Sequence, residues 1–513
     1  MHDFLLSIGT ATWILPALLL WPLVGALAVW GVGREAGAGA DARVLTLGTL
    51  IVEGLLGLAL WGVFDPSGQG WQARVDLPWL TDIGAGFSVG VDGLAMPMVV
   101  LTAIVMPLAL IGSWDNVRVK TPAFGALALM LVSGLIGIFV SLDLLLFYLA
   151  WELMLIPMYF LIGIWGTGAS ARASMRYVLF TLVGSLLMLV AILALWNLGG
   201  GTSFHIDHLI AVPLTYRVQL FMFFAFFLAF AVKSALVPFH TWLPDAQSSA
   251  PTFVAVALGF KVGTYAILRF AIPMFPAAAT DPTVRSTILV LSVIGIIYGA
   301  LLAMSQRDLK RMVAYSSISH LGFIMLGAFA LTQQSVQGAV MVMVNHGIST
   351  SALFLLAGML QDRRGTNEMG AYGGLARVVP AFSVMLTLAM LSTIGLPGTN
   401  GFVGEFLVLV GTYPERPVFA VIATSGVIFA AIYGLRALQR LLFEKLDDEA
   451  NVSLRDMSRR EMAVMSVFAV AILWLGVAPH PLLRRTDRAS AGVVQSARFG
   501  PNAPALPNLS VTP

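Results

Sequence analysis

Residues 218–247 read VQLFMFFAFFLAFAVKSALVPFHTWLPDAQ, a stretch that joins a membrane-length apolar run to a lysine and two prolines. Apolar runs of about 20 residues are typical of helices that cross a membrane. Lys233 lies inside this run, and Pro238 follows it along the chain. Because proline cannot donate a backbone hydrogen bond and its ring clashes with the preceding turn, we expect the helix to open just beyond the lysine.

The rest of the chain has the composition of a membrane protein. Of its 513 residues, 58% are hydrophobic and 11% are charged, and its mean hydropathy is +0.89. A soluble domain carries about 25% charged residues. A helical bundle in lipid can expose this much apolar surface because hydrocarbon solvates its outer face. We therefore predict an all-α polytopic membrane protein, a single membrane domain over residues 1–513 with the lipid bilayer around it.

Several kinds of chemistry are excluded by what the sequence lacks. The chain has no cysteine, which removes cysteine-ligated metal clusters, disulfides and thiol catalysis. No strand-associated GxGxxG and no GxxxxGK[ST] motif occurs, so we expect no nucleotide, flavin or other cofactor and no metal in this chain. A net charge of +3 does not suggest a nucleic-acid partner. Any energy source must arrive from a partner protein or a gradient.

Apolar runs of membrane-spanning length recur along the whole chain. We expect about fourteen spanning helices, at residues 12–31, 44–64, 91–112, 123–140, 144–165, 174–196, 218–237, 252–273, 286–304, 311–331, 336–360, 379–411, 418–439 and 461–479. The loop 65–90 is expected to form an ordered flap on the outer side. Residues 484–513 are rich in proline toward their end and are expected to form a flexible tail.

The twelfth segment is irregular in the same way as the seventh. Its sequence STIGLPGTNGFVGEF (392–406) places Pro397 among four glycines. Broken helices in corresponding places indicate a transporter built from two inverted repeats. We therefore predict repeats formed by helices 4–8 (residues 123–273) and 9–13 (residues 286–440), after helices 1–3 (12–112) and before helix 14 (461–479), with helices 7 and 12 discontinuous. Proline kinks that serve packing alone are the alternative.

The basic residues of the loops test the orientation of these helices. One side of the predicted bundle carries Arg34, Arg43, Arg118, Lys120, Arg172, Arg176, Arg307, Lys310, Arg311, Arg363, Arg364, Arg377, Arg440, Lys445, Arg455, Arg459 and Arg460. The opposite loops carry Arg74, Arg217, Arg285 and Arg416. Because basic loops stay in the cytoplasm, both termini are expected on the non-cytoplasmic side.

Titratable residues inside apolar helices are the candidate functional residues. Lys233 and Lys261 each lie mid-segment, where a lysine costs about 2.5–3.5 kcal/mol on insertion scales. Such a lysine needs a counter-charge, water or a neutral amine, and it can therefore release its proton. The candidate partners are Glu152 and Glu405, and both lie among apolar residues.

Two mid-helix histidines add to this set. His320 and His346 can relay protons because imidazole titrates near neutral pH. A static contact between helices is the alternative for each pair, and hydrogen-bonded packing is the alternative for each histidine. Glu53, Arg269 and Arg436 are interpreted as structural or interfacial residues.

Five stretches carry a resemblance to a known family. They are WELMLIPMYF (151–160), SALVPFHTWLPDAQSSAPTFVAV (234–256), YSSISHLGF (315–323), NHGISTSALFLLAG (345–358) and GLPGTNGFVGEF (395–406). They resemble the antiporter-like subunits of proton-pumping NADH:quinone oxidoreductase, respiratory complex I. The family also includes subunits of multisubunit sodium/proton antiporters and of membrane-bound hydrogenases. Two features resemble those of the middle subunit, subunit M. Glu405 stands where other such subunits are expected to carry lysine, and the long lateral helix of another subunit is not seen.

The resemblance implies roles for individual residues. Glu152 and Lys233 would be the proton-modulating pair, Lys261 and His320 the central relay, and Glu405 the outlet group, with His346 as a further member. Gln247 stands where many relatives have histidine, which argues against a titratable role there.

The same resemblance implies the setting of the chain. Quinone reduction in other subunits would drive proton transfer. Apart from the resemblance, the bias of the composition toward alanine, glycine and arginine over lysine favours a bacterial inner membrane over an organellar one. The expected partners are neighbouring antiporter-like subunits and a lateral helix. A cation/proton antiporter subunit, a subunit of a related redox complex and a structural scaffold remain alternatives.

Overall fold

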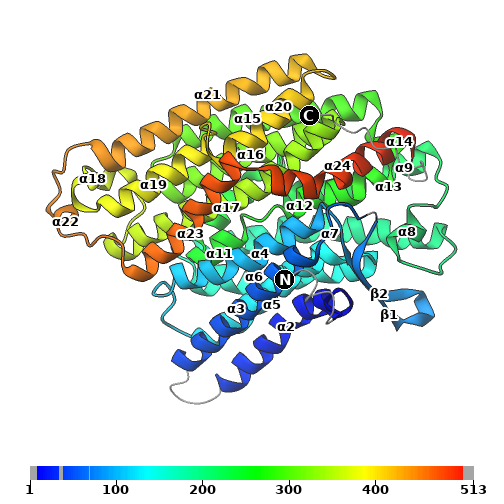
Figure 1. Cartoon of the computed structure of the whole chain (residues 1–513), viewed down its shortest axis with the longest axis horizontal. Helices are drawn as coiled ribbons and strands as arrows, with labels where there is room; N and C mark the ends of the chain where they lie inside the picture. Colours follow the sequence, from blue (N-terminus) through cyan, green and yellow to red (C-terminus); the bar gives the residue numbers. More distant parts are fainter. Residues whose placement is uncertain (1–8, 34–38, 69, 501–513) are drawn as a thin grey trace.

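The computed structural model describes residues 9–33, 39–68 and 70–500 and shows a bundle of long helices (Figure 1). Thirteen segments of the described chain are long and apolar enough to cross a membrane. They are α2 (Thr10–Val32), α3 (Gly39–Val63), α4 (Ala95–Gly112), α5 (Thr121–Val140), α6 (Leu144–Trp165), α7 (Ser170–Leu198), α9 (Tyr216–Lys233), the segment Thr252–Met274, α15 (Pro282–Ser305), α16 (Leu309–Ala330), α17 (Gln333–Arg364), α21 (Pro417–Leu438) and α23 (Arg459–Val477).

Two shorter apolar helices take the place of the twelfth predicted segment. They are α19 (Pro380–Thr393) and α20 (Asn400–Thr412). If α19 and α20 are counted together as one interrupted crossing, the described chain has fourteen crossings, the number expected from the sequence. The all-α polytopic fold is confirmed, and the two inverted repeats stay a prediction.

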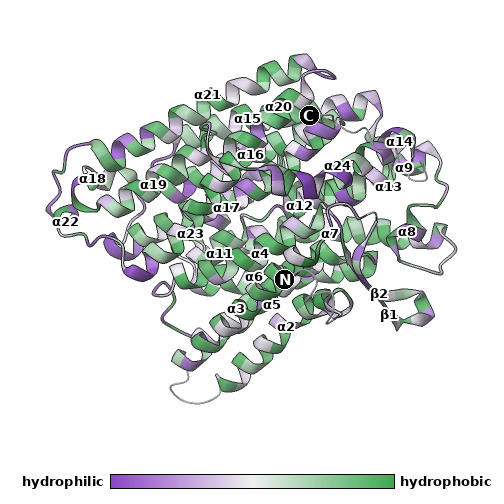
Figure 2. Cartoon of the chain, viewed as in Figure 1, coloured by the Kyte–Doolittle hydropathy of each residue, from purple (hydrophilic) through white to green (hydrophobic). Residues whose placement is uncertain are grey.

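The bundle has a buried centre and an apolar surface. Residues 338–360 of α17 are all buried, and α17 packs against α16, α20, α19, α4 and α24. At the periphery, α7 exposes Leu179, Val183 and Val190. Figure 2 shows the hydrophilic residues gathered at helix ends, in loops and along the last helix. This arrangement suits a hydrocarbon solvent, because polar residues are placed inside the bundle or at its two ends.

Helix α9 ends at Lys233, as the prolines predict. The chain then passes through Ala235, whose φ is 50°, to the 3₁₀ turn η2 (Phe239–Thr241) and to α10 (Trp242–Ser249). The indole Nε1 of Trp242 donates to the carbonyl of Val232 at 2.8 Å, which satisfies one acceptor freed by the break.

The second break separates α19 from α20 at residues 394–399. Gly395 and Gly398 have φ values of 74° and 90°, which only glycine adopts without strain. At Gly401, a Cβ would lie 1.9 Å from the carbonyl oxygen of Ser392, so the start of α20 packs directly on the end of α19.

A third break was missed by the sequence prediction, which gave one helix over 252–273. The structure has α11 (Thr252–Ala257), then α12 (Val262–Ala266), the π-helical turn η3 (Ile267–Ala271) and α13 (Ile272–Met274). Lys261 lies at the N-terminus of α12. A Cβ on Gly263 would lie 2.3 Å from Ser234 Oγ and 2.6 Å from the carbonyl oxygen of Phe230. The glycine lets α12 approach the end of α9 closely.

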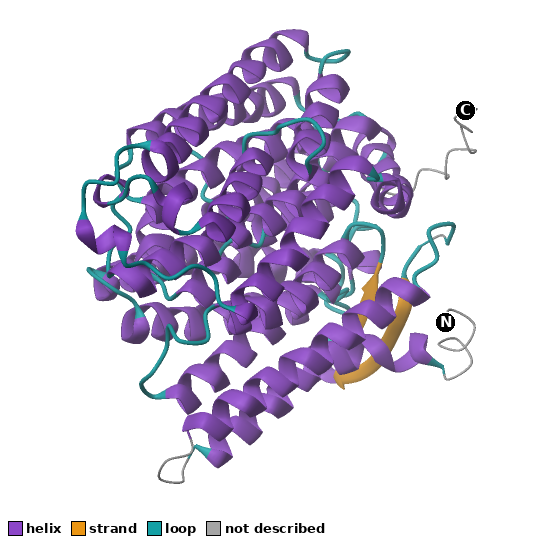
Figure 3. Cartoon of the chain, turned by 60° about the vertical axis from the view of Figure 1, so that its left-hand side comes forward, coloured by secondary structure: helices purple, strands orange, loops and turns teal. Residues whose placement is uncertain are grey.

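The described part of the loop 65–90, residues 65–68 and 70–90, is mostly a β-hairpin. Strand β1 (Gln72–Leu80) pairs antiparallel with β2 (Ala85–Val91), with Val75 opposite Val89. Figure 3 shows the hairpin at one side of the bundle. Beyond it, Asp143 caps α6 by accepting from the backbone N–H groups of Leu145 and Leu146 at 2.8 and 3.0 Å.

The prediction of a flexible tail from residue 484 is wrong for residues 484–499. They belong to α24 (His480–Phe499), which runs across α17 (Figure 1). Its buried positions recur at three- and four-residue spacing, at Leu482, Thr486, Ser490, Val493 and Ala497. The buried side of the helix docks on the bundle while Arg484, Arg488 and Arg498 are exposed, so a polar average composition hid an amphipathic helix. Pro501, Pro504 and Pro507 lie outside the described residues.

The remaining described elements are short. They are η1 (Thr81–Ile83), α8 (Ile206–Leu209), α14 (Pro276–Ala279), η4 (Met369–Ala371), α18 (Leu375–Val378), η5 (Gln439–Phe443) and α22 (Glu449–Val452). One of them, η5, continues α21 within the span Pro417–Phe443.

Candidate functional site

Lys233 ends α9 inside a cage of side chains from α6 and α7. Its Nζ donates to the hydroxyl of Tyr177 at 2.9 Å. It lies 5.4 Å from the ring centroid of Trp151 and 5.1 Å from that of Tyr177. Glu152 on α6 interacts electrostatically with Lys233. Trp151, the neighbour of Glu152 in the sequence, faces Lys233, but in the described chain no direct ion pair joins Glu152 to Lys233, and Glu152 Oε1 is buried without a hydrogen-bond partner.

Tyr177 and Trp151 are site residues that the sequence analysis missed. Tyr177 is fully buried, and its ring packs on Trp242 from the broken segment at a centroid distance of 5.3 Å. Glu152 also interacts electrostatically with Tyr177. An aromatic residue in an apolar helix carries no sequence signal of its own. The one available signal in the sequence concerned Trp151, which directly precedes the predicted site residue Glu152.

Lys261 lies at the middle of the molecule, where α11 and α12 meet. It is 5% exposed, and its backbone carbonyl accepts from Thr264 Oγ1 at 3.1 Å. Lys261 interacts electrostatically with His346 on α17. Gly263, two residues after Lys261, brings the start of α12 against the end of α9, the helix that carries Lys233.

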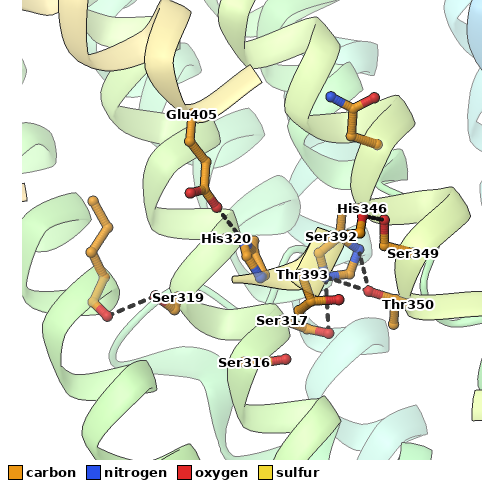
Figure 4. A network of polar contacts seen from close by, with 12 residues as sticks. Ser316, Ser317, Ser319, His320, His346, Ser349, Thr350, Ser392, Thr393 and Glu405 are labelled. Carbon is orange, nitrogen blue, oxygen red and sulfur yellow. Dashed lines mark hydrogen bonds and ion pairs between the residues drawn. The ribbon is translucent and has the colours of Figure 1, made fainter. Parts of the chain in front are cut away.

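His346 and His320 face each other across α17 and α16. Their ring centroids are 5.2 Å apart, with the ring planes at 69°. His346 Nε2 lies 3.1 Å from Ser317 Oγ, and Thr350 Oγ1 lies 3.1 Å from the same nitrogen. Figure 4 shows these hydroxyls around the imidazole of His346. At this separation and angle the two imidazoles are in edge-to-face contact.

Glu405 on α20 completes the series. Its Oε1 lies 2.9 Å from Nδ1 of His320, and both side chains are buried. Figure 4 shows the carboxylate pointing at the imidazole. Two glycines place it: a Cβ on Gly404 would lie 2.8 Å from the backbone nitrogen of Val342, and one on Gly395 would lie 2.9 Å from Glu405 Oε2. The glycine-rich break therefore lets α20 sit against α17.

A small polar cavity adjoins the three residues His320, His346 and Glu405. Its volume is ≈ 20 Å³, enough for about one water molecule. Its other polar lining residues are Asn345, Ser349, Thr350, Ser392 and Thr393. The Nε2 atom of His320 is buried without a hydrogen-bond partner among the described residues. A water here can join groups that do not touch directly.

Buried polar residues outside this series were also found. Lys310, assigned to a loop from the sequence, is 1% exposed, and its Nζ donates to Gln361 Oε1 at 2.6 Å. Arg269 forms a two-point ion pair with Asp92, one arm being Nη1 to Oδ2 at 2.9 Å. This pairing agrees with the structural interpretation of Arg269.

Glu53 and Gln247 stand apart from these contacts. Glu53 is 0% exposed, and neither carboxylate oxygen has a hydrogen-bond partner among the described residues. Gln247 is equally buried, and both atoms of its amide are unpartnered in the described chain.

The region that holds the whole series matches a known family. A model for the NADH:quinone oxidoreductase/Mrp antiporter transmembrane family matches residues 141–430. The chain belongs to this family. The matched region contains the Lys233 cage, Lys261, both histidines and Glu405. This match confirms the resemblance that was drawn from five sequence stretches.

Full-length relatives and a solved structure agree with the family. The NADH-quinone oxidoreductase subunit M of Rhodobacter capsulatus is 40% identical over 500 residues, covering 94% of this chain and 96% of that one. The subunit M of Escherichia coli K12 is 37% identical over 503 residues, covering 94% and 98%. A chain in the structure of respiratory complex I from Thermus thermophilus with bound NADH has a TM-score of 0.86 and 32% identity, covering 94% of this chain and 99% of that one.

Proposed function

We propose that the chain is subunit M of an NADH:quinone oxidoreductase and carries protons across the membrane through its buried titratable groups. Quinone reduction in other subunits supplies the energy. The observation that carries the proposal is the buried series His346, His320 and Glu405 on α17, α16 and α20, which ends in a 2.9 Å contact between imidazole and carboxylate. Such groups at membrane depth are a functional site by default.

Proton uptake takes place at the Lys233 cage. The Tyr177 hydroxyl accepts a hydrogen bond from the Lys233 ammonium, and Glu152 follows directly after Trp151, whose ring faces that ammonium. When Glu152 is neutralised or drawn away, the ammonium loses its counter-charge inside a low-dielectric cage. Lys233 then releases its proton toward Lys261. Moving one charge against the membrane field costs about 2.3 kcal/mol per 100 mV, a scale that a change in one buried ion pair can supply.

The histidines connect Lys261 to the outlet. Each imidazole can accept a proton at one nitrogen and donate from the other. The hydroxyls of Ser317 and Thr350 hold the imidazole of His346, and a water in the small cavity that both histidines line completes the path to His320. His320 passes the proton to Glu405 along their hydrogen bond, and Glu405 releases it on the far side.

The setting of the chain follows from its loops and its family. Both termini lie on the non-cytoplasmic side of a bacterial inner membrane, because the basic residues crowd the loops of the other side. The partners are the neighbouring antiporter-like subunits and a lateral helix of the complex. Electron transfer takes place in other subunits, and this chain has no cysteine to hold an iron–sulfur cluster.

The experiment is NADH-driven acidification of inside-out membrane vesicles that contain the assembled complex. We expect acidification in sodium-free buffer, and we expect Lys261→Ala to abolish it. The control Lys120→Ala changes the exposed N-cap residue of α5 and should retain acidification. Sodium-dependent transport without NADH would instead identify a cation/proton antiporter. Loss of the whole complex in Lys261→Ala, but not in Lys261→Arg, would point to a scaffold.

A further inference from the structure

An apolar pocket opens on the membrane-facing side, between α3, α4, α17, α23 and α24. Its volume is ≈ 140 Å³, and its walls include Trp61, Val100, Phe468, Trp474 and Leu482. All of its lining residues are apolar. Trp474 is 46% exposed, so the pocket opens toward the region that lipid occupies.

A second, polar hollow adjoins the pocket at the end where α24 begins. Its volume is ≈ 460 Å³, and its lining includes Asp65, His480, Arg484 and Arg485. The two hollows share a wall, because Trp61 lines the first and Gly62 the second, while Leu482 lines the first and Pro481 the second. The guanidinium of Arg485 lies 4.1 Å from the ring centroid of Trp61 and so stands at the junction.

The polar hollow carries an excess of positive charge. Arg485 spends one donor on the carbonyl of Pro481 at 3.0 Å, and its Nε is buried without a hydrogen-bond partner among the described residues. Burial and the adjoining Arg484 lower the pKa of Arg485. The carboxylate of Asp65 accepts a hydrogen bond from the hydroxyl of Ser67 at 2.6 Å. The arginines therefore present donors suited to an anion.

We propose that this two-part groove is a binding site for one anionic phospholipid of the leaflet on the α24 side. The phosphate lies against Arg484 and Arg485, and one acyl chain enters the apolar pocket. The indoles of Trp61 and Trp474 stand beside the lipid, the place that tryptophan prefers at a membrane interface. A free phosphate would leave the apolar half empty, and a zwitterionic lipid would bring its headgroup cation beside the two arginines.

The site connects the lipid to the proton pathway. Val344 and Ile348 of α17 line the same pocket, on either side of His346 in the sequence. A bound acyl chain packs against the turn of α17 that carries this histidine, and it also contacts α23 and α4. Occupancy therefore stabilises the position of α17 from the membrane side.

The test is photolabelling of the assembled complex in nanodiscs with phosphatidylglycerol that carries a diazirine on its acyl chain. We expect labels on the pocket residues, and about tenfold fewer with the matched phosphatidylcholine probe, because basic side chains attract anionic headgroups. The double variant Arg484→Gln/Arg485→Gln should lose this preference. The control Arg498→Gln removes a charge from the same helix, at its pair with Glu415, and should keep it.

A second variant addresses the pocket without changing charge. Ala471→Phe fills the pocket wall on α23 and should remove the labels, whereas Ala463→Phe lies at an exposed position of the same helix and should retain them. Equal labelling by both probes, or labelling that survives both the double variant and Ala471→Phe, would overturn the proposal by showing annular lipid only. Displacement of the probe by a short-chain quinone, but not by excess phosphatidylglycerol, would overturn it in favour of a quinone site.

Discussion

His320 on α16 and Glu405 on α20 meet side chain to side chain, with 2.9 Å between Nδ1 and Oε1, although they are 85 residues apart in the sequence. Both side chains are 7% exposed. Removing one partner of such a pair leaves the other buried without its hydrogen-bond partner, which costs more than removing both. The two residues are therefore expected to act as one unit in proton transfer.

A double-mutant cycle tests this unit. We expect His320→Ala and Glu405→Gln each to remove most of the NADH-driven proton pumping of the assembled complex. The double variant should pump no worse than the poorer single variant, because members of one unit are not additive. Glu444→Gln, at an exposed position, is the control and should pump normally. A loss of pumping in the double variant equal to the product of the two single losses would show that the two residues act independently.

The Tyr177 hydroxyl is expected to tune Lys233. Tyr177→Phe keeps the ring but deletes the group that accepts from Nζ, and a hydrogen bond to a charged group contributes about 1.5–3 kcal/mol. Pumping should slow by about tenfold while assembly is unchanged. Tyr413→Phe, at a tyrosine that is 57% exposed, should behave as wild type. A normal rate in Tyr177→Phe would remove the hydroxyl from the mechanism.

Close helix contact at Gly263 is expected to be essential for assembly. In Gly263→Ala the new Cβ would lie 2.3 Å from Ser234 Oγ, so α12 must move away from α9 at a cost of about 1–3 kcal/mol. We expect a lower melting temperature and a lower yield of assembled complex. Gly48→Ala is the matched change, since nothing lies within 4 Å of its added Cβ, and it should leave both unchanged.

The pair Asp92–Arg269 is expected to stabilise the fold. Asp92→Asn leaves a guanidinium whose side chain is 9% exposed without its counter-charge, a change that costs about 3–5 kcal/mol. Asp76→Asn breaks the pair with Arg74, whose side chains are 38% and 45% exposed, and should cost at most about 1 kcal/mol. Thermal unfolding of the purified complex compares the two. Equal melting temperatures would show that burial of Arg269 does not matter.

The sequence predicted the fold where local chemistry decides it. The break after Lys233 follows from Pro238, and the break before Glu405 follows from Pro397 and its glycines. The break before Lys261 has no proline, and it depends on how Gly263 packs against Ser234 in another segment. Such a contact between distant segments cannot be read from one stretch of chain.

The candidate site was predicted in its ionisable members but not in its surroundings. Lysine, glutamate and histidine stand out in an apolar helix because their burial is costly. Tyr177 and the hydroxyls of Ser317 and Thr350 are ordinary residues of membrane helices, and their contacts with Lys233 and His346 become visible in the structure. The helix α24 was missed because its arginines dominate the composition while its apolar residues lie on one face.

The most direct test of the central claim is proton pumping per NADH oxidised by Lys233→Ala complex in inside-out vesicles, with assembly checked on the same membranes. Lys445→Ala, at an exposed lysine, is the control. The account predicts that the assembled Lys233→Ala complex loses pumping while Lys445→Ala retains it. A wild-type ratio of protons to NADH in Lys233→Ala would contradict the account and make the buried lysine a structural residue.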